Sequence, residues 1–308
     1  MSRAAQAIIN LSALQHNLQI AKRAAPSKKN LAVIKANGYG HGIVRVANAL
    51  HEADAFAVAS LEEALTLRQA GITKSILLLE GFFGEAELSE IQHQQLDIVV
   101  NHDFQLAVLK KHSASLASSP LNVWLKIDTG MHRLGFAPEH VQTAWQQLHS
   151  CPAVAAVTLM THLANADDRN DDFTLQQLQL FDACTKQWTA PRSIANSAGI
   201  LAWPTSHADI VRPGIMLYGS TPFISGSGEE YELQPVMTLK TELIAINRLK
   251  QGDRVGYSGQ WVCPEDMSVG VAAIGYGDGY PRHAATGTPI LVNRQRTQIV
   301  GRVSMDMV

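Results

Sequence analysis

Residues 31–42 read LAVIKANGYGHG, a run of apolar residues that ends at a lysine and passes at once into a glycine-rich turn. A short apolar run bounded by turn residues is typical of a strand that is buried on both faces. A lysine is costly inside such a strand unless its ammonium group is paired or reaches the surface. The stretch therefore predicts a buried strand that carries Lys35 at its end, at the edge of a sheet.

The same pattern recurs up to about residue 234. Amphipathic helical segments, such as 61–70, 104–112, 141–149 and 173–188, separate further apolar runs, which indicates a parallel sheet covered by helices. Eight such repeats, in a span close to the roughly 250 residues typical of the fold, favour a (β/α)8 barrel (a TIM barrel) over an open sheet. The expected strands are residues 31–36, 55–59, 75–80, 97–100, 121–127, 154–161, 192–196 and 209–217.

The first helix is expected to begin at Ser12. This residue and Gln15 have the spacing of a capping box, and apolar residues follow at helical spacing until Pro26.

The character of the sequence changes near residue 235. From there, β-type runs alternate with Gly and Pro turns and no long amphipathic segment occurs, as in an antiparallel β-domain. We therefore predict a barrel domain over residues 1–234, followed by a mainly antiparallel β-domain over residues 235–308. The chain ends at Val308 inside an apolar run, so we expect the C-terminal part of the β-domain to be missing.

Composition excludes several classes of protein. The chain has 308 residues, 46% of them hydrophobic, which is ample for a large core. The net charge of −2 and the lack of a long basic run argue against nucleic acid as a partner. Neither a signal peptide nor a membrane-spanning stretch is recognisable, so we expect a soluble cytoplasmic protein. The three cysteines are far apart and the histidines lack metal-ligand spacing, so no metal site is expected.

Polar residues gather at the C-terminal ends of the predicted strands. In a TIM barrel the reactive groups lie at that rim. Two lysines, a histidine and an arginine are among them, and such a series indicates a functional site. The residues are Lys35, Ser60, Glu80, Asn101, Lys126, Asp128, His162, Asn196, Ser197 and Arg212.

The two ends of this series point to a phosphate-bearing aldehyde cofactor. Lys35 is either an ordinary strand-end lysine or a partly desolvated amine that can form a Schiff base. The glycines after it let a ligand approach the backbone, and Tyr39 can offer its hydroxyl to a phosphate. Late in the barrel, Ser197 and the backbone N–H groups of Gly214 and Ile215 are candidates to bind phosphate oxygens. An amine nucleophile and a phosphate site together are what a pyridoxal phosphate (PLP) enzyme needs.

Seven motifs occur together in one order: VIKANGYGHG at 33–42, KIDTGMHRLG at 126–135, the strand end at His162, IVRPGIMLYG at 210–219, VGYSG at 255–259, IGYGDGYPR at 274–282 and GRVSMDM at 301–307. In these motifs the chain resembles the alanine racemase family, from about residue 7 to its last residue. The resemblance implies a PLP enzyme with a (β/α)8 barrel and a C-terminal β-domain, active as a head-to-tail homodimer with shared active sites. The family continues beyond the last motif, which agrees with a β-domain that is incomplete here.

The resemblance also implies the catalytic residues. Racemisation removes the α-proton of alanine from one face and returns it on the other, so two bases on opposite faces suit the reaction. By resemblance these are Lys35, which also holds PLP covalently, and Tyr257, which comes from the partner subunit. We hypothesise that Arg212, acting through His162, stabilises the phenolate form of Tyr257.

Further roles follow from the same resemblance. Arg212 would face the pyridine nitrogen of PLP, and His162 would lie against the ring. The full set of predicted cofactor contacts is Lys35, Tyr39, Arg133, His162, Asn196, Ser197, Arg212, Gly214 and Ile215. The predicted substrate contacts are Arg133, Tyr257, Met305 and Asp306. A channel to the site would carry Asp167, Tyr276, Arg282 and Arg302.

Some alternatives stay open. Lys126 is either carbamylated, as the equivalent lysine in the family can be, or forms an ordinary ion pair with Asp128. A barrel-type PLP decarboxylase of basic amino acids, or a racemase of broader specificity, is the alternative to an alanine racemase. The enzyme would supply D-alanine for peptidoglycan, or it would serve alanine catabolism.

Overall fold

Eight parallel strands form a barrel within residues Asn10–Val236, which make up one of two compact units. The structure is a computed structural model and describes residues 3–308. The strand order is β8-β7-β6-β5-β4-β3-β2-β9, and the predicted TIM barrel is confirmed. Its strands are β2 (Lys29–Val33), β3 (Ala55–Val58), β4 (Ile76–Leu78), β5 (Asp97–Val100), β6 (Leu121–Lys126), β7 (Val154–Met160), β8 (Arg192–Ser193) and β9 (Ile210–Val211).

The two outermost strands of this order, β8 and β9, are joined by backbone hydrogen bonds. The N–H of Asp209 donates to the carbonyl of Arg192 at 3.1 Å, and the N–H of Arg212 donates to the carbonyl of Ala195 at 3.0 Å. These bonds bring β8 beside β9 and close the barrel almost completely.

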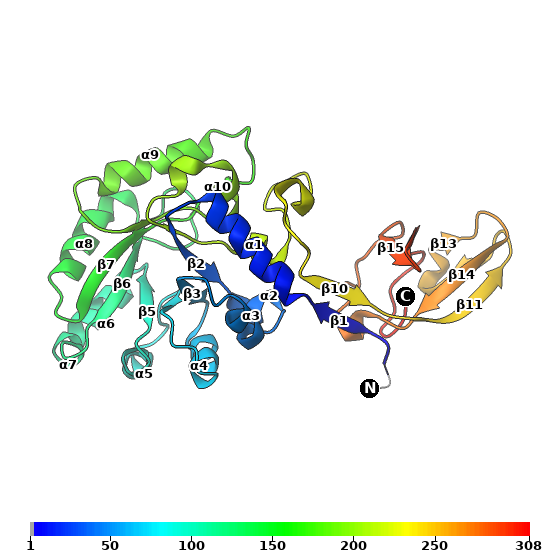
Figure 1. Cartoon of the computed structure of the whole chain (residues 1–308), viewed down its shortest axis with the longest axis horizontal. Helices are drawn as coiled ribbons and strands as arrows, with labels where there is room; N and C mark the ends of the chain where they lie inside the picture. Colours follow the sequence, from blue (N-terminus) through cyan, green and yellow to red (C-terminus); the bar gives the residue numbers. More distant parts are fainter. Residues whose placement is uncertain (1–2) are drawn as a thin grey trace. The chain divides into compact units, whose positions relative to one another are not determined.

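Helices cover the outside of the barrel (Figure 1). The four amphipathic segments expected from the sequence are helical, as α4 (Leu61–Gln69), α6 (Asp103–Lys111), α8 (Val141–His149) and α9 (Phe173–Thr185). The helices of this unit are α1 (Leu11–Ala24), α2 (Lys35–Tyr39), α3 (Ile43–Ala49), α4 (Leu61–Gln69), α5 (Leu88–His93), α6 (Asp103–Lys111), α7 (Ser113–Leu116), α8 (Val141–His149), α9 (Phe173–Thr185) and α10 (Ser197–Ala202).

The cap of α1 differs from the expectation. Asn10, not Ser12, precedes the helix, and its side-chain oxygen accepts a hydrogen bond from the N–H of Ala13 at 3.0 Å. Asparagine is as good an N-cap as serine. Starting the helix at Leu11 also leaves Ser12 within the first turn, so the prediction of Ser12 as the helix start was wrong.

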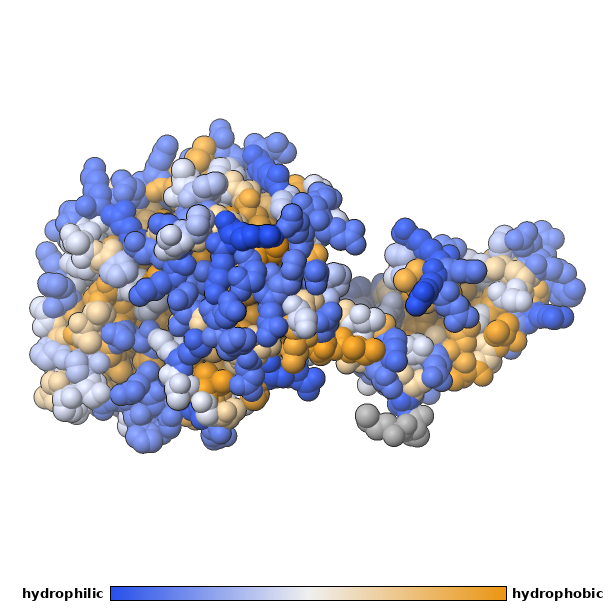
Figure 2. Space-filling model, viewed as in Figure 1, coloured by the Kyte–Doolittle hydropathy of each residue, from blue (hydrophilic) through white to orange (hydrophobic). Residues whose placement is uncertain are grey.

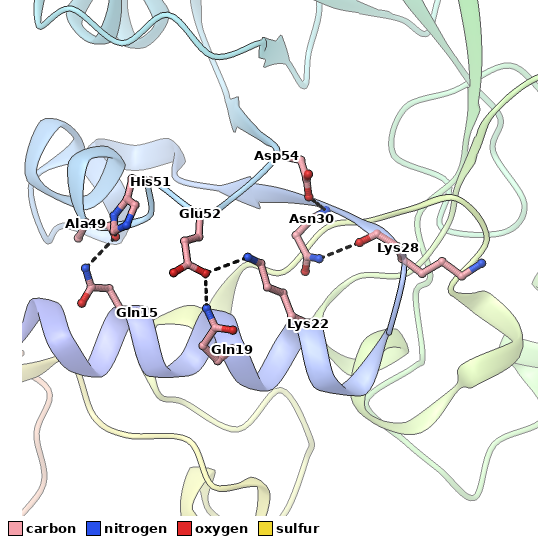
Figure 3. A network of polar contacts seen from close by, with 9 residues as sticks. All are labelled: Gln15, Gln19, Lys22, Lys28, Asn30, Ala49, His51, Glu52 and Asp54. Carbon is pink, nitrogen blue, oxygen red and sulfur yellow. Dashed lines mark hydrogen bonds and ion pairs between the residues drawn. The ribbon is translucent and has the colours of Figure 1, made fainter.

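Polar contacts tie α1 to the end of α3 and to the segment after it (Figure 3). Gln19 Nε2 and Lys22 Nζ both donate to Glu52 Oε2, at 2.6 and 3.1 Å. Gln15 Nε2 donates to the carbonyl of Ala49 at 3.2 Å. Exposed ion pairs of this kind contribute at most about 1 kcal/mol each.

Apolar side chains fill the interior of the barrel. They come from the inward-facing positions of neighbouring strands, as expected where side chains alternate between the two faces of a sheet. The cluster consists of Leu31, Val33, Ala57, Leu77, Val99, Trp124 and Met160.

The second compact unit consists of antiparallel two-stranded ladders. It comprises residues up to Ile9 together with Met237–Val308. The pairs are β1 with β10, β11 with β14, β12 with β13 and β15 with β16, so the predicted antiparallel β-domain is confirmed. The strands are β1 (Gln6–Ile9), β10 (Met237–Lys240), β11 (Leu243–Leu249), β12 (Arg254–Val255), β13 (Trp261–Val262), β14 (Met267–Ala272), β15 (Pro289–Val292) and β16 (Gln295–Gln298).

Residues 3–9 differ from the predicted domain division. The sequence analysis places them in the barrel domain, but strand β1 pairs with β10, with Gln6 opposite Lys240 and Ile9 opposite Met237. This pairing gives each short strand a hydrogen-bonded neighbour along one edge, and it groups β1 with the β-domain. A pairing between segments more than 200 residues apart leaves no local signal in the sequence.

The surface of the β-domain carries exposed apolar side chains. Hydrophobic side chains gather on the face of this unit visible in Figure 2, and Ile244 and Ile246 on β11 are 59% and 66% exposed.

Within residues 3–308, no helix combines the length and the apolar composition that crossing a membrane requires.

Candidate functional site

One cavity of about 550 Å³ opens among the strand ends of the barrel. Val33 and Met160 belong both to the apolar cluster of the barrel and to the cavity lining, so the core forms part of the cavity wall. A volume of this size suits a small organic ligand. All barrel residues that were assigned a cofactor, substrate, channel or carbamylation role line this cavity: Lys35, Tyr39, Lys126, Arg133, His162, Asp167, Asn196, Ser197, Arg212, Gly214 and Ile215. Of the other residues in the strand-end series, Glu80 also lines it, whereas Ser60, Asn101 and Asp128 do not.

Lys35 is followed by a left-handed turn. Ala36, Asn37 and Tyr39 all have φ near 53°, and Gly38 and Gly40 have φ of 64° and 81°. A left-handed conformation costs a residue other than glycine roughly 1–2 kcal/mol. Strand β2 ends at Val33, so the predicted strand over 31–36 is too long.

Hydrogen bonds within the turn support this conformation. The N–H of Gly38 donates to the carbonyl of Ile34, and the N–H of Gly40 donates to the carbonyl of Ala36, both at 2.9 Å. Gly38 also packs closely, because a Cβ there would lie 3.0 Å from Val46 Cγ2. The turn is therefore a defined structure that orients Lys35.

Ser197, Gly214 and Tyr39 meet at one side of the cavity. Ser197 Oγ accepts hydrogen bonds from the N–H groups of Gly214 at 2.9 Å and Met216 at 3.3 Å. A Cβ at Gly214 would lie 2.9 Å from Tyr39 Oη, so a larger residue there would displace the Tyr39 hydroxyl. Burial raises the pKa of Tyr39, so its hydroxyl stays protonated and can donate. These groups form a small polar cradle built from backbone and hydroxyls.

Asn196 has a structural role in addition to lining the cavity. It precedes α10, and its Oδ1 accepts from the N–H of Gly199 at 3.0 Å as an N-cap. Its Nδ2 donates to the carbonyl of Leu163 at 3.2 Å.

Tyr218 was missed by the sequence analysis as a neighbour of the site. Its ring stacks on that of Tyr39 with 4.5 Å between centroids, and its hydroxyl donates to the carbonyl of Val33 at 3.4 Å. Burial raises the pKa of Tyr218, so the pair is uncharged. The only signal for it in the sequence is its place in the motif 210–219.

Arg212 is buried, and among residues 3–308 it contacts no carboxylate. It donates to Thr161 O and Ser193 Oγ, both at 2.6 Å, and to Ile194 O at 3.1 Å. Burial lowers its pKa, but a guanidinium stays protonated at neutral pH.

His162 lies next to Arg212. Its Nδ1 accepts from an Arg212 nitrogen at 3.4 Å, which puts the ring proton on Nε2. Burial, followed by the positive charge of Arg212, holds the pKa of His162 well below its ordinary value. The imidazole is therefore neutral, and the positive charge of the pair stays on Arg212.

Lys126 is a second unusual cation of the cavity. It is 7% exposed, and burial, with added repulsion from Arg212 and Arg133, lowers its pKa to about 8. Within residues 3–308 it forms no ion pair. Asp128 instead accepts hydrogen bonds from the N–H groups of Gly130 at 2.9 Å and His132 at 3.0 Å. The Lys126–Asp128 ion pair that the sequence left open is not formed.

Two buried glutamines that the sequence analysis did not single out hold the rim of the barrel. Gln177 on α9 accepts from the N–H of Ala164 at 2.8 Å and donates to the carbonyl of His162 at 3.2 Å. Gln105 on α6 accepts from the N–H of Asn101 at 2.8 Å. Backbone groups just beyond a strand end lack ladder partners, and helix side chains satisfy them here.

Replacing Arg212 with methionine is expected to lower the free energy of unfolding by about 3–5 kcal/mol, because the buried oxygens of Thr161, Ser193 and Ile194 would lose their charged donor. Denaturant unfolding of the purified proteins measures this loss. Arg192→Met is the matched control, since Arg192 forms an exposed ion pair with Asp182 worth at most about 1 kcal/mol. Equal losses in the two variants would contradict the prediction.

The other predicted site residues lie in the β-domain and are not among the residues that line the cavity. Tyr257 and Met305 are 69% and 61% exposed. The N–H of Tyr276 donates to the carbonyl of Ser304 at 3.0 Å, so the motifs 274–282 and 301–307 form one local structure. The guanidinium of Arg282 lies 5.8 Å from the centre of the Tyr276 ring. Asp306 and Arg302 belong to the second of these motifs.

Comparison with known proteins gives consistent matches over both units. Two family models match the chain, "Alanine racemase, N-terminal domain" over residues 9–222 and "Alanine racemase, C-terminal domain" over residues 236–308. The alanine racemase of Halorhodospira halophila is 52% identical over 309 residues, which span 100% of this chain and 84% of that one. The alanine racemase of Nitrosococcus oceani is 53% identical over 304 residues, spanning 98% of this chain and 84% of its own. The crystal structure of the biosynthetic alanine racemase from Pseudomonas aeruginosa has a TM-score of 0.93 at 45% identity, covering 99% of this chain and 85% of that one.

Proposed function

The chain belongs to the alanine racemase family, and from this premise we propose how its residues interconvert L-alanine and D-alanine. One observation carries the proposal. A single cavity joins an amine that follows the first barrel strand to the polar cradle of Ser197, Gly214 and Tyr39 near the end of the barrel.

The residues of the cavity fit pyridoxal phosphate. Lys35 would hold the aldehyde carbon of the cofactor covalently through its amine. Tyr39, Ser197 and the backbone of Gly214 and Ile215 would contact the phosphate, and glycine at position 214 leaves the Tyr39 hydroxyl in place. When bound, PLP supplies an electron sink for the pair left on the α-carbon of alanine once its proton is removed.

The two arginines of the cavity differ in their surroundings. Arg133 lines the cavity. Because a guanidinium can donate two parallel hydrogen bonds to a carboxylate, Arg133 would bind the carboxylate of the substrate. Arg212 is fixed by Thr161 and Ile194 and can only donate, so towards the ring nitrogen of PLP it offers no acceptor. That arrangement would limit side reactions that need a protonated ring. Neutral His162 would lie against the ring without adding charge.

Two bases would remove and return the α-proton of alanine. Lys35 would serve one face of the substrate, and Tyr257 of the partner subunit would serve the other. Tyr257 and Met305 are large, exposed side chains of the β-domain, as expected of residues that a second copy of the chain covers. We therefore propose a homodimer with shared active sites.

Met305 and Asp306 of the partner subunit would line the substrate pocket. Asp167, Tyr276, Arg282 and Arg302 would border the channel to it.

Lys126 is expected to be carbamylated. Its amine is uncharged above about pH 8, and an uncharged amine adds to carbon dioxide with loss of a proton. The anionic product would face Arg212 and Arg133, whose charges favour it. Carbon-13 bicarbonate should therefore give a carbamate NMR signal that grows as the pH rises through about 8. The signal should be absent in Lys126→Met. An unlabelled wild-type protein at higher pH would show that Lys126 remains a free amine.

The proposed reaction is tested with the purified protein and PLP. L-Alanine is incubated with it in deuterated water, followed by chiral separation and NMR of the α-position. We expect both enantiomers to form, each carrying deuterium at the α-carbon. Release of carbon dioxide and an amine would instead show a decarboxylase. L-Alanine that stays unchanged would refute the proposal.

A further inference from the structure

Glu63 on α4 holds the left-handed turn after Lys35 from outside. We propose that Glu63 is a positioning residue, which fixes the turn and with it the amine of Lys35 at the cavity. The inference rests on the role proposed above for Lys35. It adds a residue that none of the motifs contains.

The contacts of Glu63 join two strand ends. Its Oε1 accepts from the N–H of Asn37 in the turn, and its Oε2 accepts from the N–H of Ala59 directly after β3, both at 2.9 Å. Hydrogen bonds to a carboxylate are roughly twice as strong as those between neutral groups. Asn37 is also held on its other side, because its Oδ1 accepts from the N–H of Ile43 at 2.9 Å. The middle of the turn is thus clamped between α4 and α3.

The turn needs such support because its backbone is strained. Ala36, Asn37 and Tyr39 all lie in the left-handed region without being glycine. Conformations of this kind persist only where the surrounding structure over-determines them. Lys35 shares a peptide group with Ala36, so relaxation of Ala36 towards a right-handed or extended conformation would disturb the backbone at Lys35 and with it the position of its amine. A displacement of about 1 Å in a reacting group can cost roughly a hundredfold in rate.

The test compares Glu63→Ala and Glu63→Gln with Glu62→Ala in the PLP-loaded enzyme. Glu62 is an exposed carboxylate in the same first turn of α4, so it is a matched control. Borohydride reduction and peptide mapping measure the fraction of PLP attached to Lys35, and steady-state assays give kcat and KM. Glu63→Ala is expected to lower both the attached fraction and kcat, with kcat falling about tenfold to a hundredfold and KM changing little. Glu63→Gln keeps one acceptor oxygen and should lie between, whereas Glu62→Ala should match the wild type.

A second substitution distinguishes positioning from general support of the fold. Glycine adopts the left-handed region without strain, so Ala36→Gly should restore much of the attached fraction and of kcat in the Glu63→Ala background. A defect in the packing of α4 would not respond to a change at position 36. The proposal is overturned if Glu63→Ala behaves like Glu62→Ala, or if Ala36→Gly restores nothing. Failure of the wild type itself to attach PLP or racemise alanine would refute the proposed function instead.

Discussion

Replacing Lys35 with alanine is expected to abolish racemisation, with kcat reduced by about 10⁴-fold or more, because one residue supplies both the covalent hold on PLP and one of the two bases. The substituted protein should bind PLP only reversibly, through the cradle of Tyr39, Ser197 and Gly214. Gel filtration should therefore remove the cofactor, and borohydride should leave no labelled peptide. Chiral chromatography of alanine after long incubation measures the residual rate.

An exposed lysine provides the control for this experiment. Lys186 lies at the end of α9, outside the cavity lining, and Lys186→Ala should keep full activity and full labelling at Lys35. Turnover that survives in Lys35→Ala, or a label on another lysine, would show that the amine has been assigned to the wrong residue.

Replacing Tyr257 with phenylalanine should lower kcat by about 10²–10⁴-fold while leaving PLP attached to Lys35, because only the hydroxyl that exchanges the proton is removed. The side chain is 69% exposed, so the fold should be unaffected. Exchange of the α-proton of L-alanine in deuterated water should disappear. Tyr280→Phe, in the same unit but assigned no role, is the control. Unchanged exchange in Tyr257→Phe would remove this tyrosine from the mechanism.

Mixing the two inactive proteins tests whether sites are shared between subunits. If Lys35 of one subunit works with Tyr257 of another, a mixed dimer of Lys35→Ala and Tyr257→Phe chains contains one intact site. Random exchange of subunits should then restore roughly a quarter of the wild-type activity. A mixture that stays inactive after refolding together would contradict the shared-site arrangement.

Most of the barrel and its rim could be predicted from sequence. Each strand is a continuous apolar run next to an amphipathic helix, so its position is encoded locally. Barrel topology then brings the strand ends to one rim, which is why residues as distant as Lys35 and Arg212 line one cavity. Most of the strand-end residues assigned from this topology line the observed cavity, whereas Ser60, Asn101 and Asp128 do not.

Other features could not be predicted because they depend on non-local or unusual backbone structure. The expected strand continued through Lys35 to Ala36, yet Ala36 is left-handed, a conformation that its residue type does not suggest. The clamp by Glu63 crosses from α4 to the turn after β2 and involves backbone N–H groups, which have no sequence signature. Asp128 binds the N–H groups of its own loop instead of Lys126, although both residues were correctly placed at one strand end.

The ladder of β1 and β10 has a practical consequence for truncated forms of the protein. In the described part of the chain β1 is the only strand that pairs with β10. A clone that starts at Asn10, which would look like a natural boundary for the barrel, would leave Met237–Lys240 as a bare strand edge if the β-domain were kept. Such an edge, with Leu239 already half exposed, is a template for pairing with other chains and hence for aggregation. The isolated barrel should therefore be produced by removing both segments together, and an intact β-domain needs its first strand supplied from the opposite end of the polypeptide.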